Sequence, residues 1–297
     1  MIEGKFQIIV LGCSGGPREN DVSAYLVSTL KGDQWITLDA GTLLSGLEIA
    51  ARKNEIPLTS LEMFKKIQAY LISHAHLDHI AALIINSPID RPKPILGSDR
   101  TIDNIRDHLF NDKIWANYGD EGVNPLSLYH YMRLPLHKEV AIPNTSFTIE
   151  AFDLNHGRSV SSAFLIGYEG HYLLYLGDTA SDETENVKRL TLLWKRTAEI
   201  LKKGRLHALF LECSFPYEDK RPNLFGHLDT KLMMIELHRL AELSKSSLEG
   251  LKVIVTHRKE NLSPVLDDRE RIAEELTSFN DLSLQFIFPS QGEKLIV

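Results

Sequence analysis

The chain has 297 residues, of which 43% are apolar, 25% charged and 8% aromatic. These proportions are typical of an ordinary globular protein and exclude a disordered, collagen-like or membrane-embedded chain. Lys and Arg together number 33 against 40 Asp and Glu, which gives a formal net charge of −7. Because surfaces that bind polynucleotides carry a basic excess or a basic stripe, this balance argues against a long nucleic acid as partner.

The cysteine content and the start of the chain both bear on the compartment. Cys13 and Cys213 are the only cysteines, and two distant cysteines are not a disulfide framework. The first residues lack the features of a signal peptide, and no apolar run reaches the ~18 residues that span a bilayer. We therefore expect a cytoplasmic protein without a membrane partner.

Short apolar runs alternate with helix-like segments along the chain. In the first part we predict strands over 6–11, 24–27, 35–38 and 69–72, and helices over 42–54 and 78–86, the latter opened by Asp78. Later strands are predicted over 145–154, 162–168, 172–176, 208–211 and 253–255, helices over 185–203, 230–243 and 267–279, and two more strands at the end. No linker or repeat divides the chain, so we expect residues 1–297 to form one domain, with an irregular insertion or lid near 111–143.

Residues that can bind metals directly follow five of the predicted strands. They are the segment 74–79 (HAHLDH), His156, Asp178, Glu212 and His257. In α/β folds the ligands gather at the carboxyl edge of the sheet, where loops open a crevice. The five strands therefore offer these side chains to one rim.

The spacing within segment 74–79 predicts two metal sites. His74 and His76 are two residues apart in extended chain and point to the same side, whereas Asp78 and His79 lie on the next helical turn. One site would take His74, His76 and His156, the other Asp78, His79 and His257, and Asp178 would bridge the two ions. Imidazole and carboxylate ligands favour Zn²⁺, with Mn²⁺ or Fe as the alternatives.

These residues also carry a family resemblance. The HxHxDH motif with a later His, Asp and final His resembles the metallo-β-lactamase superfamily. Residues 74–88 (HAHLDHIAALIINSP) are similar to the signature of the class II cyclic-nucleotide phosphodiesterases, except that Ala82 stands where Gly or Ser is favoured. Supporting segments are LGCSGGPREN (11–20), SSAFLI (161–166), YLGDTASD (175–182), LECSF (211–215) and LFGHL (224–228).

The resemblance implies an α/β fold of the four-layer αβ/βα sandwich type and hydrolysis of 3′,5′-cyclic nucleotides (cAMP or cGMP) to nucleoside 5′-monophosphates. A hydroxide bridging the two metal ions would attack phosphorus in line with the 3′ oxygen. By analogy with the related tRNA-processing nucleases, His227 would protonate this oxygen while Glu212 holds the imidazole. Asp78, His227 and Glu212 are thus the candidate catalytic residues, and a plain helix-capping turn before Asp229 is the alternative for His227.

Two other functions stay open. A tRNA 3′-end processing endonuclease is the first, and the negative net charge and the lack of a basic, Gly-rich arm argue against it. A non-catalytic nucleotide-binding module of the same fold is the second. The complete ligand set argues against that module, because degenerate members lose ligands first.

Several further features have no settled role. The Gly12–Gly16 segment would either bring backbone N–H groups to a phosphate or form a plain tight turn. For the aromatic residues of the irregular segment, packing in a lid or in a homodimer contact is favoured over stacking on a purine. These aromatic residues are Trp115, Tyr118, Tyr129 and Tyr131. We expect both cysteines to be buried packing residues. No role is assigned to the histidines outside the strand ends and the 225–227 turn, which are His108, His130, His137, His171, His207 and His238.

Overall fold

The computed structural model describes residues 4–185, 187–218, 224–261 and 267–297. Within these ranges the strands form two sheets of seven strands each. The first sheet contains, in spatial order, β14 (Lys294–Ile296), β1 (Phe6–Gly12), β2 (Ala24–Thr29), β3 (Trp35–Leu38), β4 (Ile67–Leu71), β5 (Lys93–Gly97) and β6 (Tyr129–Arg133). The second contains β13 (Gln285–Ile287), β12 (Lys252–Thr256), β11 (Leu206–Glu212), β10 (His171–Leu176), β9 (Ser159–Tyr168), β8 (Thr148–His156) and β7 (Glu139–Ala141).

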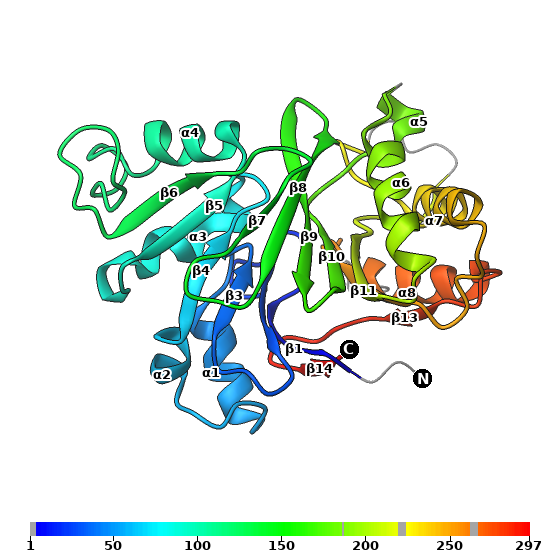
Figure 1. Ribbon diagram of the computed structural model, residues 1–297, viewed down its shortest axis with the longest axis horizontal. Helices are drawn as coiled ribbons and strands as arrows, with labels where there is room; N and C mark the ends of the chain where they lie inside the picture. Colours follow the sequence, from blue (N-terminus) through cyan, green and yellow to red (C-terminus); the bar gives the residue numbers. More distant parts are fainter. Residues whose placement is uncertain (1–3, 186, 219–223, 262–266) are drawn as a thin grey trace.

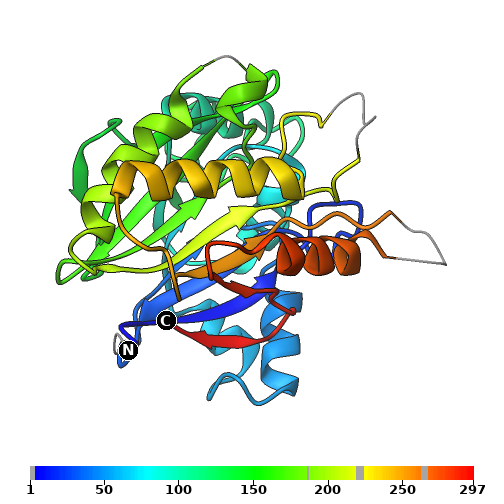
Figure 2. The same cartoon turned by 90° about the vertical axis from the view of Figure 1, so that its right-hand side faces the viewer.

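Helices flank the two sheets on opposite sides (Figure 1). On the first sheet lie α1 (Leu44–Arg52), α2 (Ser60–Phe64), α3 (Leu77–Asn86) with the short 3-10 helix η1 (Ser87–Ile89), and α4 (Asp99–His108). On the second lie α6 (Arg189–Leu201), α7 (Thr230–Ser244) and α8 (Asp268–Phe279), with the short α5 (Asp182–Glu185) before α6. In Figure 2 this second helical layer faces the viewer, with α7 and α8 in front of the strands.

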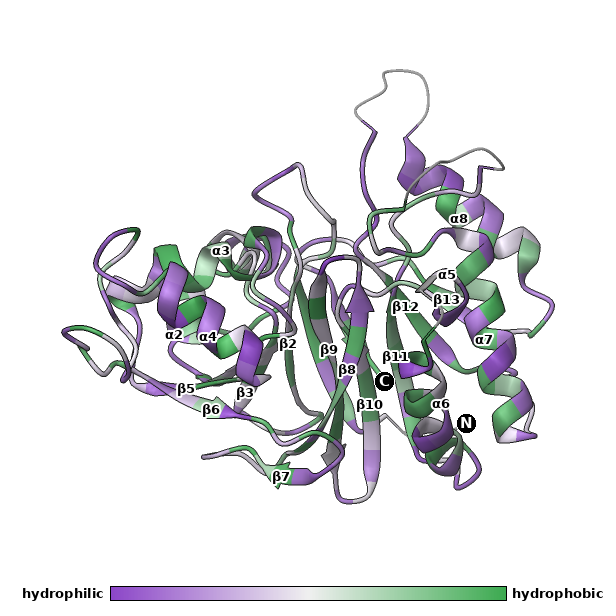
Figure 3. Cartoon of the chain, turned by 90° about the horizontal axis from the view of Figure 1, so that it is seen from above, coloured by the Kyte–Doolittle hydropathy of each residue, from purple (hydrophilic) through white to green (hydrophobic). Residues whose placement is uncertain are grey.

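The alternation of side chains along the strands explains this order of layers. In β1, Phe6, Ile8 and Val10 belong to the apolar cluster between the two sheets, whereas Ile9 and Leu11 belong to the cluster under α1–α4. Because successive side chains of a strand point to opposite faces, a strand that is apolar throughout must be covered on both faces. The inner strands are correspondingly hydrophobic in Figure 3. The arrangement is the four-layer αβ/βα sandwich.

The structure corrects the sequence prediction at several elements. It contains β5 and α4, which the apolar pattern did not reveal, and the predicted helix over 185–203 begins only at Arg189. Asp78 does not open α3, because the helix begins at Leu77 and His76 occupies the N-cap without a side-chain hydrogen bond. None of the described helices is both long and apolar enough to cross a membrane.

The irregular segment 111–143 is partly built into the sheets. It contributes β6 to the edge of the first sheet and β7 to the edge of the second. Its aromatic residues Trp115, Tyr118, Tyr129 and Tyr131 all pack in or against the cluster under α1–α4. Packing within the protein therefore accounts for these rings, and the expected action of the segment as a lid stays a prediction.

A buried ion pair anchors β5 and β6 next to α3. The Asp90 carboxylate accepts hydrogen bonds from Lys93 Nζ at 2.6 Å, Tyr70 Oη at 2.6 Å and Tyr129 Oη at 2.8 Å. Both charged side chains are almost fully buried. Removing one partner of such a pair leaves an uncompensated buried charge.

We therefore expect Asp90→Ala to lower the free energy of unfolding by about 3–5 kcal/mol, measured by denaturant titration. The matched control is Asp33→Ala, because Asp33 pairs with Lys66 on the exposed surface and this change should hardly alter stability. Equal losses in the two variants would contradict a stabilising role of burial at Asp90.

Candidate active site

The strand ends of both sheets bring the seven predicted metal ligands together. His74 and His76 lie between β4 and α3, Asp78 and His79 in the first turn of α3, His156 at the end of β8, Asp178 after β10 and His257 after β12. The structure forms three groups whose ligand atoms lie within 4.8 Å of one another: His74, His76, His156 and Asp178; Asp78, His79 and His257; and Asp178, His227 and His257. The first two groups match the two sets that the sequence predicts, whereas the third adds His227, which the sequence analysis treats as an acid and not as a ligand.

Asp178 lies where the two groups meet. Its Oδ1 is 3.2 Å from His79 Nε2, and its Oδ2 is 3.3 Å from His257 Nε2. The same Oδ2 is 3.6 Å from His156 Nε2 and 3.7 Å from His74 Nε2. One carboxylate thus faces imidazoles of both groups, which is the position that a bridging ligand requires.

The buried histidines of the cluster are held from outside by their Nδ1 atoms. His79 Nδ1 bonds to Asp39 Oδ2 at 2.7 Å, His156 Nδ1 to the Gly226 carbonyl at 2.9 Å and His257 Nδ1 to Ser214 Oγ at 2.9 Å. Ring nitrogens held in this way fix the orientation of a metal-binding imidazole.

The ring nitrogens that point into the cluster show whether these residues could bind a metal ion. The Nε2 atom of His74 is buried and lacks a hydrogen-bond partner among the described residues, its distance to Asp178 Oδ2 being 3.7 Å. A buried polar atom without a partner is costly and needs an explanation. Imidazole nitrogens that converge on a carboxylate are the donor set of a transition-metal site, so the residues fit a divalent ion.

Asp39 is a second carboxylate behind the cluster that the sequence reasoning missed. Besides His79, it accepts hydrogen bonds from the Ser73 backbone N and from Ser73 Oγ, both at 2.7 Å, and from Tyr175 Oη. Ser73 Oγ in turn contacts His74 Nδ1 at 3.0 Å. Asp39 directly follows β3, so the rule that identified the other strand-end residues also applies to it.

Electrostatics keep the central carboxylate charged. Burial opposes the ionisation of Asp178, yet the neighbouring His257 and His79 hold its pKa well below the usual range. Burial and the proximity of His79 lower the pKa of His74 far below its usual value, which favours the neutral ring. A charged carboxylate and a neutral imidazole are the states in which these groups bind metals.

Glu212 and His227 form a hydrogen-bonded pair beside this cluster. Glu212 ends β11, and its Oε1 lies 2.9 Å from His227 Nδ1 while its Oε2 accepts from Ser214 Oγ at 2.7 Å. Burial alone would lower the pKa of His227, but the Glu212 carboxylate raises it above the usual value. His227 Nδ1 is 3.8 Å from Asp178, so Glu212 is its closer acidic partner.

The other ring nitrogen of His227 faces Lys259, another residue that the sequence reasoning missed. Lys259 Nζ lies 3.1 Å from His227 Nε2. The capping function belongs to Asp229, whose side chain accepts from the Leu232 N–H at the start of α7. The position of His227 is therefore explained by its contact with Glu212 rather than by helix capping.

The glycine-rich segment after β1 packs against the cluster. A Cβ atom at Gly15 would lie 2.3 Å from atoms of the His257 ring, so only glycine fits this close contact. Cys13 and Cys213 are both buried and free. Packing thus accounts for Gly15, while the contact of this segment with a phosphate stays a prediction.

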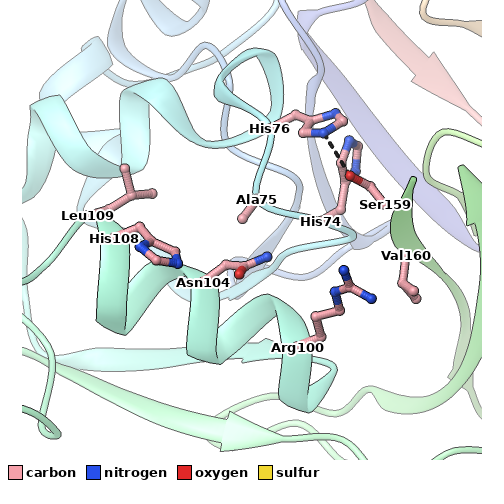
Figure 4. Close-up of a pocket in the computed structure, with 9 residues that line it drawn as sticks. All are labelled: His74, Ala75, His76, Arg100, Asn104, His108, Leu109, Ser159 and Val160. Atoms are coloured by element: carbon pink, nitrogen blue, oxygen red, sulfur yellow. Dashed lines mark hydrogen bonds between the residues drawn. The ribbon is translucent and has the colours of Figure 1, made fainter. Parts of the chain in front are cut away.

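A pocket of about 250 Å³ opens next to the cluster on the side of His74 and His76 (Figure 4). Its other walls come from Ala75, from α4 and the following Leu109, and from the start of β9. Because the apolar pattern of the sequence does not reveal α4, it does not reveal this pocket either. Substrate bound at the cluster would have this space beside it.

Comparison with known proteins decides the family. The model of the class-II cAMP phosphodiesterases matches residues 42–292. The chain belongs to this family. The 3′,5′-cyclic-nucleotide phosphodiesterase of Aliivibrio fischeri is 33% identical over an alignment of 306 positions, which covers 98% of this chain and 93% of that protein.

Solved structures agree with the fold of this family. Unliganded yeast PDE1 has a TM-score of 0.89 at 24% identity and covers 99% of this chain and 100% of its own. YhfI from Bacillus subtilis, a metallo-β-lactamase fold protein, has a TM-score of 0.66 at 18% identity over 99% of this chain and 100% of its own. The family, the fold and the phosphodiesterase class expected from the sequence are confirmed.

Asp39 offers a test of how the class-II phosphodiesterase site is organised. Asp39→Asn keeps the shape of the side chain but replaces one of the oxygens that hold His79 and Ser73. We expect metal affinity, measured by competition with a chelator, to fall about 10- to 100-fold, because outer hydrogen-bond partners orient metal ligands.

The control is Asp153→Asn, a change in β8 away from this hydrogen-bond network. Circular dichroism should show that both variants retain the fold. Unchanged metal affinity in a folded Asp39→Asn protein would refute the positioning role.

Proposed function

We propose that this chain hydrolyses 3′,5′-cyclic nucleotides to nucleoside 5′-monophosphates at a centre that holds two divalent metal ions. The observation that carries the proposal is the convergence of both ligand groups on Asp178. Membership of the class-II family supports the choice of substrate. Zn²⁺ is the favoured ion for these imidazole-rich groups, and Mn²⁺ or Fe are the alternatives.

Each ligand has a defined place in this proposal. His74, His76 and His156 serve one ion, Asp78, His79 and His257 serve the other, and Asp178 is shared. The ions would supply Lewis-acid stabilisation of phosphate charge and lower the pKa of a water molecule. Asp39, Ser73 and Ser214 hold the imidazoles in the orientation that binding requires.

His227 is the proposed general acid for the departing 3′ oxygen. A ribose alkoxide is strongly basic, so cleavage is fast only if this oxygen receives a proton. Glu212 fixes the Nδ1 side of the ring and raises the pKa of His227, which leaves Nε2 as the proton donor. Lys259 places a positive charge beside the same nitrogen, which lowers the pKa of His227 and so opposes the effect of Glu212 and favours release of the proton.

The unpaired cysteines support a cytoplasmic setting for this reaction. Both are buried, and neither forms a disulfide. Free thiols are typical of reducing compartments. Intracellular cyclic nucleotides would be available to the enzyme there.

Metal content and substrate range test the proposed function together. Purified protein should contain close to two transition-metal ions per chain, and chelation should abolish turnover of cAMP and cGMP until metal is restored. Precursor tRNA should be neither bound tightly nor cut, given the net charge of −7. One ion per fully loaded chain would contradict the two-metal centre, and cleavage of tRNA without turnover of cyclic nucleotides would favour the endonuclease.

Two substrates with different leaving groups separate the acid from the metal ligands. His227→Ala should slow hydrolysis of cAMP by about 10²–10⁴-fold, the usual contribution of general acid catalysis. The same variant should largely spare bis(p-nitrophenyl) phosphate, because p-nitrophenolate leaves without a proton. Glu212→Gln should show a weaker form of this pattern, and Asp178→Ala should abolish both activities.

The control for this comparison is His238→Ala, since His238 pairs with Asp281 on the protein surface. Equal losses on the two phosphodiesters would mean that His227 binds metal or phosphate. Full activity of His227→Ala on both cAMP and bis(p-nitrophenyl) phosphate would mean that His227 has no catalytic role and only belongs to the turn.

A further inference from the structure

One face of α4 points at the metal-ligand cluster. Arg100, Asn104 and His108 stand at four-residue spacing and line the pocket beside His74 and His76 (Figure 4). Residues four apart in a helix lie on the same face. The opposite face carries Ile102 and Ile105, which are buried in the core, so packing does not account for the three polar side chains.

These three side chains also lack partners within the protein. Among the described residues, none of them forms a side-chain hydrogen bond or ion pair. Arg106 on the same helix differs, because it contacts Asp103, Asp107 and Glu121. In a chain with an excess of acidic residues, an unpartnered arginine beside a cluster of metal ligands has donors that are free for a ligand.

The pocket has the dimensions and the walls of a site for part of a small molecule. Its volume is about 250 Å³, close to the lower limit of ~300 Å³ for ligand pockets. Ala75, Leu109 and Val160 add apolar surface to the polar face of α4. Ser159 joins the pocket to the cluster, since its Oγ lies 3.1 Å from His76 Nε2.

The position of the pocket relative to His227 indicates which part of the substrate would enter it. His156 lies between the two, with its Nε2 3.2 Å from His76 Nδ1 and its ring centroid 4.7 Å from that of His227. If the 3′ oxygen of the ribose faces His227, the sugar ring can lie over His156. Its base then extends toward the pocket at His76.

We propose that Arg100, Asn104 and His108 form the subsite for the purine base of the cyclic nucleotide. Guanidinium planes and imidazole rings stack on bases, and Arg and Asn pair with the edges of purines. The subsite would contribute binding of the nucleoside part and no proton transfer. This inference rests on the proposed function, because it takes the substrate to be a cyclic nucleotide.

The test compares a substrate that has a base with one that does not. For Arg100→Ala we expect the KM for cAMP to rise about 10-fold with kcat nearly unchanged, which is the signature of lost uniform binding. The KM for bis(p-nitrophenyl) phosphate should stay the same. Arg100→Lys should not restore the KM for cAMP, because an ammonium group lacks the planar fork of the guanidinium.

Asn104→Ala and His108→Ala should raise the KM for cAMP in the same selective way, and separate measurements with cGMP show which purine each side chain prefers. The matched control is Arg52→Ala at the exposed end of α1, which should alter neither substrate. All four positions are at least partly exposed, so circular dichroism should confirm an intact fold.

The outcomes separate this inference from the proposed function. If Arg100→Ala raises the KM for both phosphodiesters equally, Arg100 binds phosphate and the base subsite is refuted. If neither KM changes while the wild-type protein turns over cAMP, the inference alone is overturned. If the wild-type protein does not turn over cyclic nucleotides, the proposed function fails and this inference fails with it.

Discussion

The burial of one charged carboxylate determines much of this structure. Asp178 is almost inaccessible to water, and it lies within 3.7 Å of imidazole nitrogens from four histidines. A buried carboxylate is costly unless opposite charges or hydrogen bonds surround it. Histidines that follow strands of both sheets must therefore lie close to the Asp178 carboxylate. Protons on these histidines or bound metal ions supply the positive charge that stabilises the buried carboxylate.

The packing between the two sheets fixes the positions of the ligand side chains relative to one another. Asp39 follows a strand of the first sheet, and Tyr175 belongs to a strand of the second, yet the tyrosine hydroxyl donates to the carboxylate. Tyr175 is part of the apolar cluster between the sheets. Because close-packed interiors transmit displacements, a shift of one sheet against the other would move His79 relative to His156 and His257. The geometry of the ligand cluster therefore depends on the packing of the core between the sheets.

The seven candidate ligands were predictable from the sequence because their signal is local. An HxHxDH segment after a strand and single residues at later strand ends are visible without knowing how the sheets pack. The two groups around Asp178 follow from the rule that parallel strands end at one edge. The four layers were predictable from the family resemblance, whereas the alternation of strands and helices indicated only an α/β fold.

Other parts of the site depend on contacts that leave no pattern in the sequence. Ser214 is an ordinary serine until the fold places it 2.9 Å from His257. Helix α4 escaped prediction because few apolar residues mark its buried face, among them Ile102 and Ile105. Gly15 looked like a phosphate-binding or turn residue, whereas its contact with the His257 ring becomes evident only in three dimensions.

Net charge and local charge have different consequences for the substrate. The chain carries −7 overall, while Arg100 and Lys259 place positive charges on two sides of the cluster. At physiological ionic strength, exposed charges are screened beyond about 8 Å. A cyclic mononucleotide is small enough to experience mainly these local cations and the ligand cluster. The local cations are therefore the charges that a small phosphodiester bound at the cluster would meet, although the net charge of the chain is negative.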